Sequence, residues 1–255
     1  MDERIQIVPI NDEVTLLNDH NESTCYLVTG TQSALLIDTA NGYVDLNALC
    51  RRLTPLPVTV VNTHGHCDHI YGNLFFEQAY LHPADFELHD EHFAFPEIRK
   101  AMETTGLAPA RLLPLAIGQV FDLGGGHALE VVPLYGHTPG SVGLLDRKYR
   151  LLFSGDGANP HIWMQLPESL PIETLRDSLS ALRREHGGAF DALLTGHGSG
   201  PEPAEVVDWL IEGCEELLRG ERENDRPYRW FRGECRAHPY GGEENRVIVY
   251  DESKL

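Results

Sequence analysis

The chain has 255 residues, with 39 Asp and Glu against 20 Lys and Arg, so its formal net charge is −19. This charge weighs against a nucleic-acid partner, because binding a phosphate backbone needs a basic surface that releases counterions. No stretch reaches the roughly 18 to 20 apolar residues that span a bilayer, and the N-terminus lacks a secretory signal pattern. We therefore expect a cytoplasmic protein with neither nucleic acid nor membrane as a partner.

The first quarter of the chain predicts strands followed by a helix. Short apolar runs separated by Asn, Asp and Gly turns are typical of strands. The predicted strands cover residues 5–8, 14–17, 24–28, 34–37 and 58–62. Before the last of them, residues 44–53 carry apolar side chains at helical spacing, which predicts one helix.

Residues 86–118 fall outside that scheme. Apolar residues alternate there with three prolines, which favours helices and loops, and we expect a lid insertion over a site. The cluster of His82, Asp85, His89 and His92 has the residue types of a metal site, but an exposed helix face explains it better.

The second half repeats the first. Residues 128–133, 141–145, 150–153 and 192–195 predict strands, and residues 172–185 predict a helix. Two β-rich halves with helices predict an α/β fold, an αββα four-layer sandwich with helices on both outer faces. We expect residues 1–220 to form the catalytic domain and residues 221–255 to form a β-rich extension packed on it.

The sequence Thr63-His64-Gly65-His66-Cys67-Asp68-His69 holds three imidazoles and a carboxylate directly after a predicted strand. Side chains at a strand end can converge on one point. Neutral imidazole and carboxylate are ligands that Zn, Mn and Fe accept. The spacing therefore predicts a metal site.

Three further turns each offer one side chain of the same kind. They carry His137, Asp156 and His197, each next to glycine. Glycine lets the backbone turn sharply and approach a metal without a side-chain clash. Together with the first motif, these turns predict a single shared site.

In this order the motifs resemble those of the metallo-β-lactamase superfamily, over about residues 5–218. The resemblance implies that sandwich fold and two divalent metal ions, with Zn expected and Fe or Mn as alternatives. One ion would be held by His64, His66 and His137, and the other by Asp68, His69 and His197. Asp156 would bridge the two, and Asp38, at the end of a predicted strand, would support the first motif from behind.

The resemblance also implies a reaction. Two ions about 3.5 to 4 Å apart can share a hydroxide that attacks an ester, thioester or lactone, with Asp68 as the catalytic residue that moves the proton. Cysteine-bearing β-lactamases have Cys where this chain has Asp156. The sequence is therefore similar to the wider branch with glyoxalase II, lactonases and thioesterases.

Two other functions stay open. One is a mononuclear-iron oxygenase like the persulfide dioxygenases of the superfamily, which hold iron with two histidines and one aspartate. The other is a non-catalytic metal-binding protein. The complete ligand set favours the hydrolase.

For the substrate we expect a small molecule, bound against an apolar wall made by Trp163 with Phe93 and Phe95 of the lid segment. The sequence leaves the oligomeric state open, so a homo-oligomer stays an alternative to a monomer.

Overall fold

The computed structural model describes residues 4–255, whose strands form three sheets. The first sheet contains, in spatial order, β1 (Ile5–Pro9), β2 (Val14–Asp19), β3 (Ser23–Thr29), β4 (Ala34–Ile37), β5 (Val58–Val61), β6 (Gln78–Leu81) and β7 (Arg111–Pro114). The second contains β14 (Glu202–Pro203), β13 (Ala192–Thr195), β11 (Leu151–Gly155), β10 (Val142–Asp146), β9 (His127–Pro133) and β8 (Val120–Gly124). The third contains β12 (His161–Trp163), β17 (Val247–Tyr250), β16 (Gly233–Pro239) and β15 (Arg226–Trp230).

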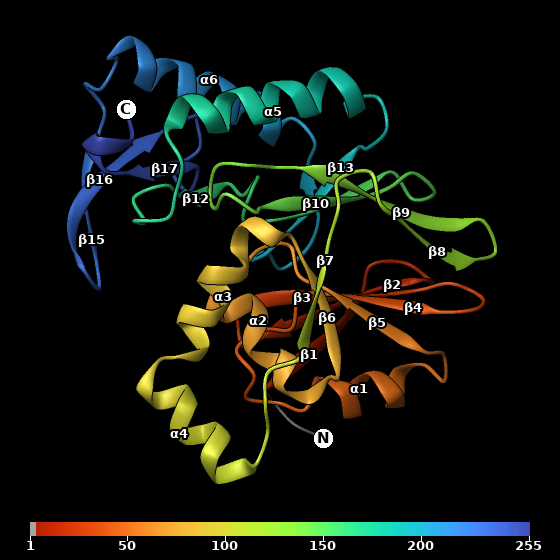
Figure 1. Ribbon diagram of the computed structural model, residues 1–255. Coiled ribbons are helices and arrows are strands. Elements are labelled where there is room, and N and C mark those ends of the chain that lie inside the picture. The colour runs from red at the N-terminus through yellow and green to blue at the C-terminus, as the bar shows by residue number, and fades with distance from the viewer. Residues whose placement is uncertain (1–3) are drawn as a thin grey trace.

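The helices lie mostly on the outside of the two large sheets (Figure 1). They are α1 (Leu46–Leu53), α2 (Cys67–Ile70), α3 (Phe86–Phe93), α4 (Pro96–Thr105), α5 (Ile172–His186) and α6 (Val206–Arg219), with short 3₁₀ turns at Tyr71–Phe75, Pro83–Asp85 and Glu252–Lys254. Within residues 4–255, none of these helices has the length and apolar character needed to cross a membrane.

Three apolar clusters define four layers. The central cluster joins the two large sheets, where the Tyr26 and Phe153 rings meet edge to face at 5.2 Å. A second cluster packs α1 under the first sheet, through residues such as Leu46 and Leu49. A third packs α5 and α6 over the second sheet. The structure thus confirms the predicted αββα sandwich, because each of the two large sheets packs against the other sheet on one face and against helices on the other.

The helix α5 shows why the local pattern predicted the elements well. Its buried residues Ile172, Leu175, Leu179 and Leu182 follow the spacing of one helix face. The prediction did not include α6, β6 or β7. It also assigned all of residues 86–118 to a lid, whereas β7 pairs in parallel with β6 and is the edge of the first sheet. A four-residue strand with half-exposed side chains carries no clear alternation, so only pairing reveals it.

The third sheet brings the end of the chain back to the middle. β12, five residues after Asp156, pairs in parallel with β17, with Trp163 opposite Val249. β15 and β16 continue this sheet as a hairpin. In Figure 1, β15 is the free edge of the sheet and extends past the body of the second sheet toward α2 and α3. Residues 226–250 are therefore neighbours of the segment that follows Asp156.

Candidate metal centre and active site

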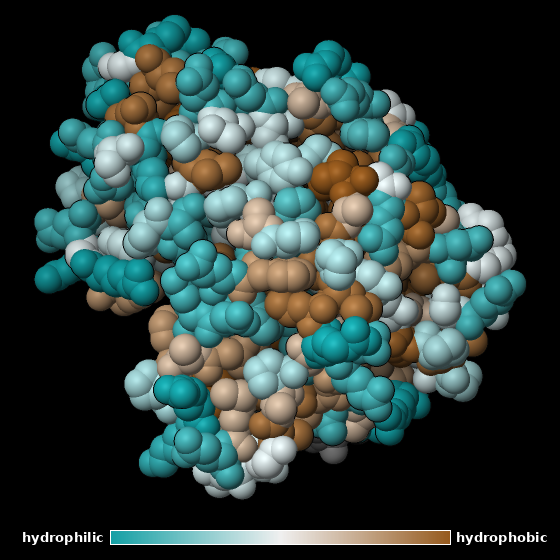
Figure 2. All heavy atoms as spheres, in the orientation of Figure 1, coloured by the Kyte–Doolittle hydropathy of each residue, from teal (hydrophilic) through white to brown (hydrophobic). Residues whose placement is uncertain are grey.

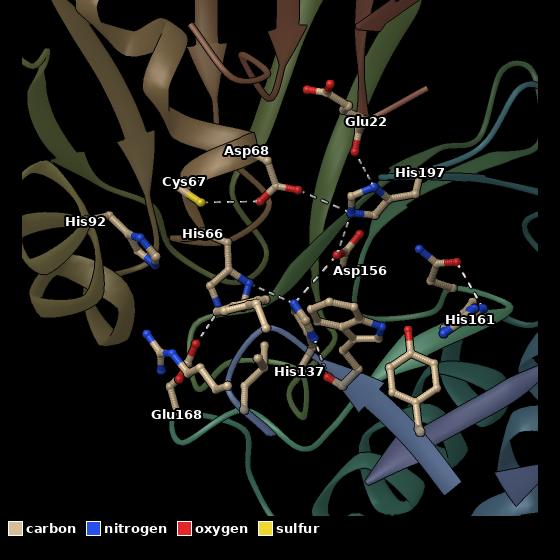
Figure 3. A pocket seen from close by; sticks show the side chains of 16 residues that line it. Glu22, His66, Cys67, Asp68, His92, His137, Asp156, His161, Glu168 and His197 are labelled. Atoms are coloured by element: carbon tan, nitrogen blue, oxygen red, sulfur yellow. Dashed lines mark hydrogen bonds and ion pairs between the residues drawn. The ribbon is translucent and has the colours of Figure 1, made fainter. Parts of the chain in front are cut away.

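The seven predicted metal ligands meet at one edge of the sandwich. His64 and His66 follow β5, and Asp68 and His69 lie in the short helix α2. His137 follows β9, Asp156 follows β11 and His197 follows β13. Figure 3 shows the side chains of His66, His137, Asp156 and His197 pointing toward one another from these separate turns.

Their donor atoms form three overlapping groups within 4.8 Å. The groups are His64, His66 and His137; Asp68, His69 and His197; and His64, His69 and Asp156. The first two match the ligand sets that the family resemblance implied. The third contains Asp156 with one histidine from each set, which is the position expected of a bridging carboxylate.

Asp156 contacts both sets through one oxygen. Its Oδ2 lies 3.0 Å from His197 Nε2, 3.8 Å from His69 Nε2 and 3.6 Å from His137 Nε2. The other oxygen, Oδ1, is buried and accepts no hydrogen bond within residues 4–255. A carboxylate in this position can neutralise positive charge on both sides at once.

Each of the five histidines among the predicted ligands is oriented by a hydrogen bond from its outer nitrogen. Three of these N–H groups donate to side chains: His64 Nδ1 to Thr63 Oγ1 (3.0 Å), His66 Nε2 to Glu168 Oε1 (2.7 Å) and His69 Nδ1 to Asp38 Oδ2 (2.9 Å). Two donate to backbone carbonyls: His137 Nδ1 to Trp163 (2.7 Å) and His197 Nδ1 to Glu22 (2.8 Å). Such bonds set the tautomer and turn the other nitrogen's lone pair inward, as metal-binding histidines require.

The inward nitrogens are placed to bind a cation. His66 Nδ1 and His137 Nε2 are 2.8 Å apart, a distance at which two lone pairs repel unless positive charge lies between them. In the described part of the chain, His64 Nε2 and His69 Nε2 are buried without a hydrogen-bond partner. An unpaired buried polar atom costs about 1 to 3 kcal/mol. The donor set of imidazole and carboxylate therefore fits divalent metal ions of the Zn, Fe or Mn type.

The pKa values reflect the same charge distribution. Burial and the neighbouring His66 lower the pKa of His137 to about 4. Burial alone would also lower the pKa of His69, but the Asp68 and Asp156 carboxylates raise it to about 10. The site thus combines a histidine set that resists protonation with a carboxylate set that attracts positive charge.

Asp38 supports the site from behind, as the resemblance implied. It is buried with φ at 61°, a left-handed conformation that is unusual for a residue other than glycine. Its carboxylate accepts bonds from Thr63 N at 2.7 Å, Thr63 Oγ1 at 2.8 Å and His69 Nδ1. One buried group therefore fixes both ends of the first motif.

Asp85 is a second support, and it corrects the expectation of an exposed helix face. Asp85 and His89 are buried. The Asp85 carboxylate accepts bonds from Gly65 N at 2.9 Å, Thr138 Oγ1 at 2.6 Å and Gly140 N at 2.7 Å. It therefore ties the His64–His66 turn to the His137 turn. The contact partners are far apart in sequence, so no local pattern signals this role.

A cavity of about 650 Å³ opens onto the inward side of the metal ligands. Trp163, predicted as a wall residue, lines it, as do Tyr228, Phe231 and Arg232 from the C-terminal hairpin. The sequence-based prediction did not place these last three residues at the site, because their position depends on how β17 pairs with β12.

The two predicted lid aromatics lie elsewhere. Phe93 is 5% exposed and packs with Ile70 and Leu74 in a small core cluster. Phe95 is 40% exposed and does not line the cavity. Helix α3 turns Phe93 toward α2, so this ring stabilises the helix that carries the predicted ligands Asp68 and His69.

Comparisons with known proteins identify the family and the fold. The family model of the metallo-beta-lactamase superfamily matches residues 19–204. The acyl-coenzyme A thioesterase MBLAC2 of Gallus gallus is 31% identical over 171 residues, 53% of this chain and 57% of that protein. Its counterpart in Bos taurus is 28% identical over 213 residues, 69% of this chain and 73% of that protein.

Solved structures show the same fold at low identity. A metallo-beta-lactamase from Erythrobacter litoralis is 19% identical with a TM-score of 0.61, covering 85% of this chain and 99% of that one. The sec-alkylsulfatase Pisa1 from Pseudomonas sp. is 14% identical with a TM-score of 0.66, covering 85% of this chain and 42% of that one. These likenesses concern the fold alone.

Proposed function

Because this chain belongs to the metallo-beta-lactamase superfamily, we propose that it is a dinuclear-metal thioesterase that hydrolyses acyl-coenzyme A thioesters. The observation that carries the proposal is the pair of three-residue donor groups beside a cavity, with Asp156 in contact with both. The similarity to acyl-coenzyme A thioesterases supports the substrate class.

His64, His66 and His137 would hold one ion, Asp68, His69 and His197 the other, and Asp156 would lie between them. Divalent ions in such a site lower the pKa of water and polarise a carbonyl oxygen. We expect Zn, as in the sequence-based prediction, because its preferred ligands are nitrogen and carboxylate oxygen.

In the reaction, water adds to the thioester carbonyl carbon, the carbon–sulfur bond breaks, and the sulfur leaves as a thiol. Asp68 is suited to take the proton from the attacking water, because its partly exposed carboxylate lines the cavity. Burial would raise the pKa of Asp68, but His69 and His197 lower it, so the group is ionised and able to accept that proton. The proton then goes to the departing sulfur.

The persulfide dioxygenase alternative needs only two histidines and one aspartate. Here all seven donors are present and the five histidines are oriented by outer partners, which favours the dinuclear hydrolase. A non-catalytic protein has no need to preserve that arrangement beside a cavity.

The test measures metal content and thiol release on protein purified without added metal. We expect about two equivalents of Zn per chain and release of coenzyme A from an acyl-coenzyme A, both lost after chelation and regained with Zn. Asp156→Asn keeps the shape but removes the bridging charge, so it should lower metal content and cut turnover by about a hundredfold or more.

The matched control is Asp191→Asn, an exposed aspartate paired with Arg150 on the surface, which should leave both readouts unchanged. One equivalent of iron with oxygen-dependent persulfide consumption would replace the proposal with the oxygenase. Hydrolysis at the wild-type rate by Asp156→Asn would show that Asp156 is not a bridging ligand.

A further inference from the structure

The C-terminal hairpin forms part of the cavity wall. β15 and β16 pair from Arg226 opposite Ala237 to Trp230 opposite Gly233, which leaves Phe231 and Arg232 as the two residues of the tip. Figure 2 shows a marked indentation in the outline of the molecule. In the same orientation, Figure 1 shows that the indentation lies between this end of β15 and helices α3 and α4. The tip therefore stands at the opening of the active-site cavity.

Aromatic rings continue from the metal site to this tip. Trp163 lies 6.1 Å from Trp230 and 6.4 Å from Phe231 between ring centroids. The Trp163 carbonyl also accepts the bond from His137 Nδ1, so one residue connects a metal ligand to the hairpin. Phe231 is 77% exposed. A large exposed aromatic at the mouth of a catalytic cavity is a surface suited to an apolar ligand.

Arg232 adds charge at the same place. It is the one Lys or Arg among the residues that line the cavity. Within residues 4–255 no carboxylate lies within 4.0 Å of its guanidinium, which lies 5.6 Å from the centre of the Phe231 ring. The cavity lining that includes Arg232 also includes His66, His92 and Glu168.

An unpaired arginine matters in this chain because the net charge is −19. A negatively charged substrate gains nothing from the overall field of such a protein, so attraction has to be local. Arginine recognises phosphate through two parallel hydrogen bonds, and its planar group also packs on aromatic faces.

We propose that the hairpin tip selects phosphate-bearing thioesters: Arg232 binds a phosphate of the coenzyme A leaving group, and Phe231 with Trp163 covers the linker between that phosphate and the thioester. This inference rests on the proposed thioesterase function. It makes the C-terminal extension a specificity element that the metal motifs do not contain.

The hairpin itself offers a matched control. Side chains alternate between the two faces of a strand, so Arg229 lies on the face opposite Tyr228 and Trp230. Arg229 is exposed, does not line the cavity, and has no ion-pair partner among the described residues. Arg229→Gln therefore removes the same charge from the same hairpin without touching the site.

The experiment compares two substrates with one acyl group: an acyl-coenzyme A and the acyl thioester of N-acetylcysteamine, which lacks phosphates. Arg232→Gln should raise KM for the acyl-coenzyme A about tenfold, as for loss of a charged hydrogen bond. Its kcat, and both constants for the neutral thioester, should stay within about twofold. Phe231→Ala should raise KM for both substrates, and Arg229→Gln should change neither.

A binding measurement gives an independent readout. Calorimetry with coenzyme A that lacks its sulfur should show about tenfold weaker binding to Arg232→Gln than to the wild type and to Arg229→Gln. Equal effects of the two arginine variants, or equal losses on both substrates for Arg232→Gln, would overturn the role of Arg232. If the wild type hydrolyses neither thioester, the proposed function fails, and the calorimetry still tests the phosphate site.

Discussion

Gly196 provides a sharp test of how closely the chain approaches the metal site. The residue precedes His197, and a Cβ atom placed on it would lie 2.3 Å from Asp156 Oδ1 and 2.6 Å from His69 Cε1. Non-bonded carbon atoms normally come no closer than about 3.5 Å. In Gly196→Ala, either the backbone or the two side chains must therefore move by about 1 Å.

The backbone has little freedom to move. Gly196 N donates to the Gly155 carbonyl at 2.9 Å, and the Gly196 carbonyl accepts from Thr24 N at 2.7 Å. The ring of His69 is fixed on its other side by Asp38. The displacement therefore falls on Asp156 and His69, which are both expected metal ligands.

We expect Gly196→Ala to lose about 1 to 3 kcal/mol of unfolding free energy, as overpacked cores do. A displacement of about 1 Å within a reacting site costs about a hundredfold in rate. Metal content per chain, chemical denaturation and thiol release measure these effects. Gly200→Ala is the control, because a Cβ there meets nothing within 4 Å. Normal metal content and activity in Gly196→Ala would refute the account of this close approach.

Two further predictions concern side chains that no motif contained. Glu168→Ala removes the acceptor that orients His66, so metal affinity measured by competition with a chelator should fall about tenfold to a hundredfold. Glu168→Gln should recover part of that affinity, and unchanged affinity in both variants would show that Glu168 does not have this role. His127 is buried, which by itself lowers its pKa, but its bond to Asp146 raises the pKa above the usual value. The imidazolium therefore stabilises the fold fully below about pH 6.5, and this effect is lost as pH rises through the raised folded pKa. His127→Gln should lower the unfolding free energy by about 1 to 3 kcal/mol at pH 6 and by less at pH 9, as measured by urea unfolding with chelator present. A loss that grows with pH would contradict the assignment.

The sequence predicted much of the framework for a physical reason. Strand β4 is a continuous buried apolar run and helix α5 follows helical periodicity, and residues within one strand or one helix determine both signals among themselves. Short strands without alternation, such as β7, were missed because their only signal is a partner far along the chain.

The residues that converge as candidate metal ligands were also readable, since ligand type, spacing and adjacent glycines are local properties of each turn. The residues that hold those side chains in place could not be predicted from the sequence. Asp85 bonds to Gly65 and Gly140, and Glu168 bonds to His66, across separations that no spacing encodes.

The sequence by itself therefore determined which atoms can bind metal, because the identity of a donor does not depend on distant contacts. Only the tertiary structure decided what surrounds those atoms. The parallel pairing of β12 with β17 carries Phe231 and Arg232 to the cavity that Trp163 lines. Such pairing follows from the packing of the whole sheet, in which residues from the middle and the end of the chain meet, so the substrate-facing wall appears only once the chain is folded.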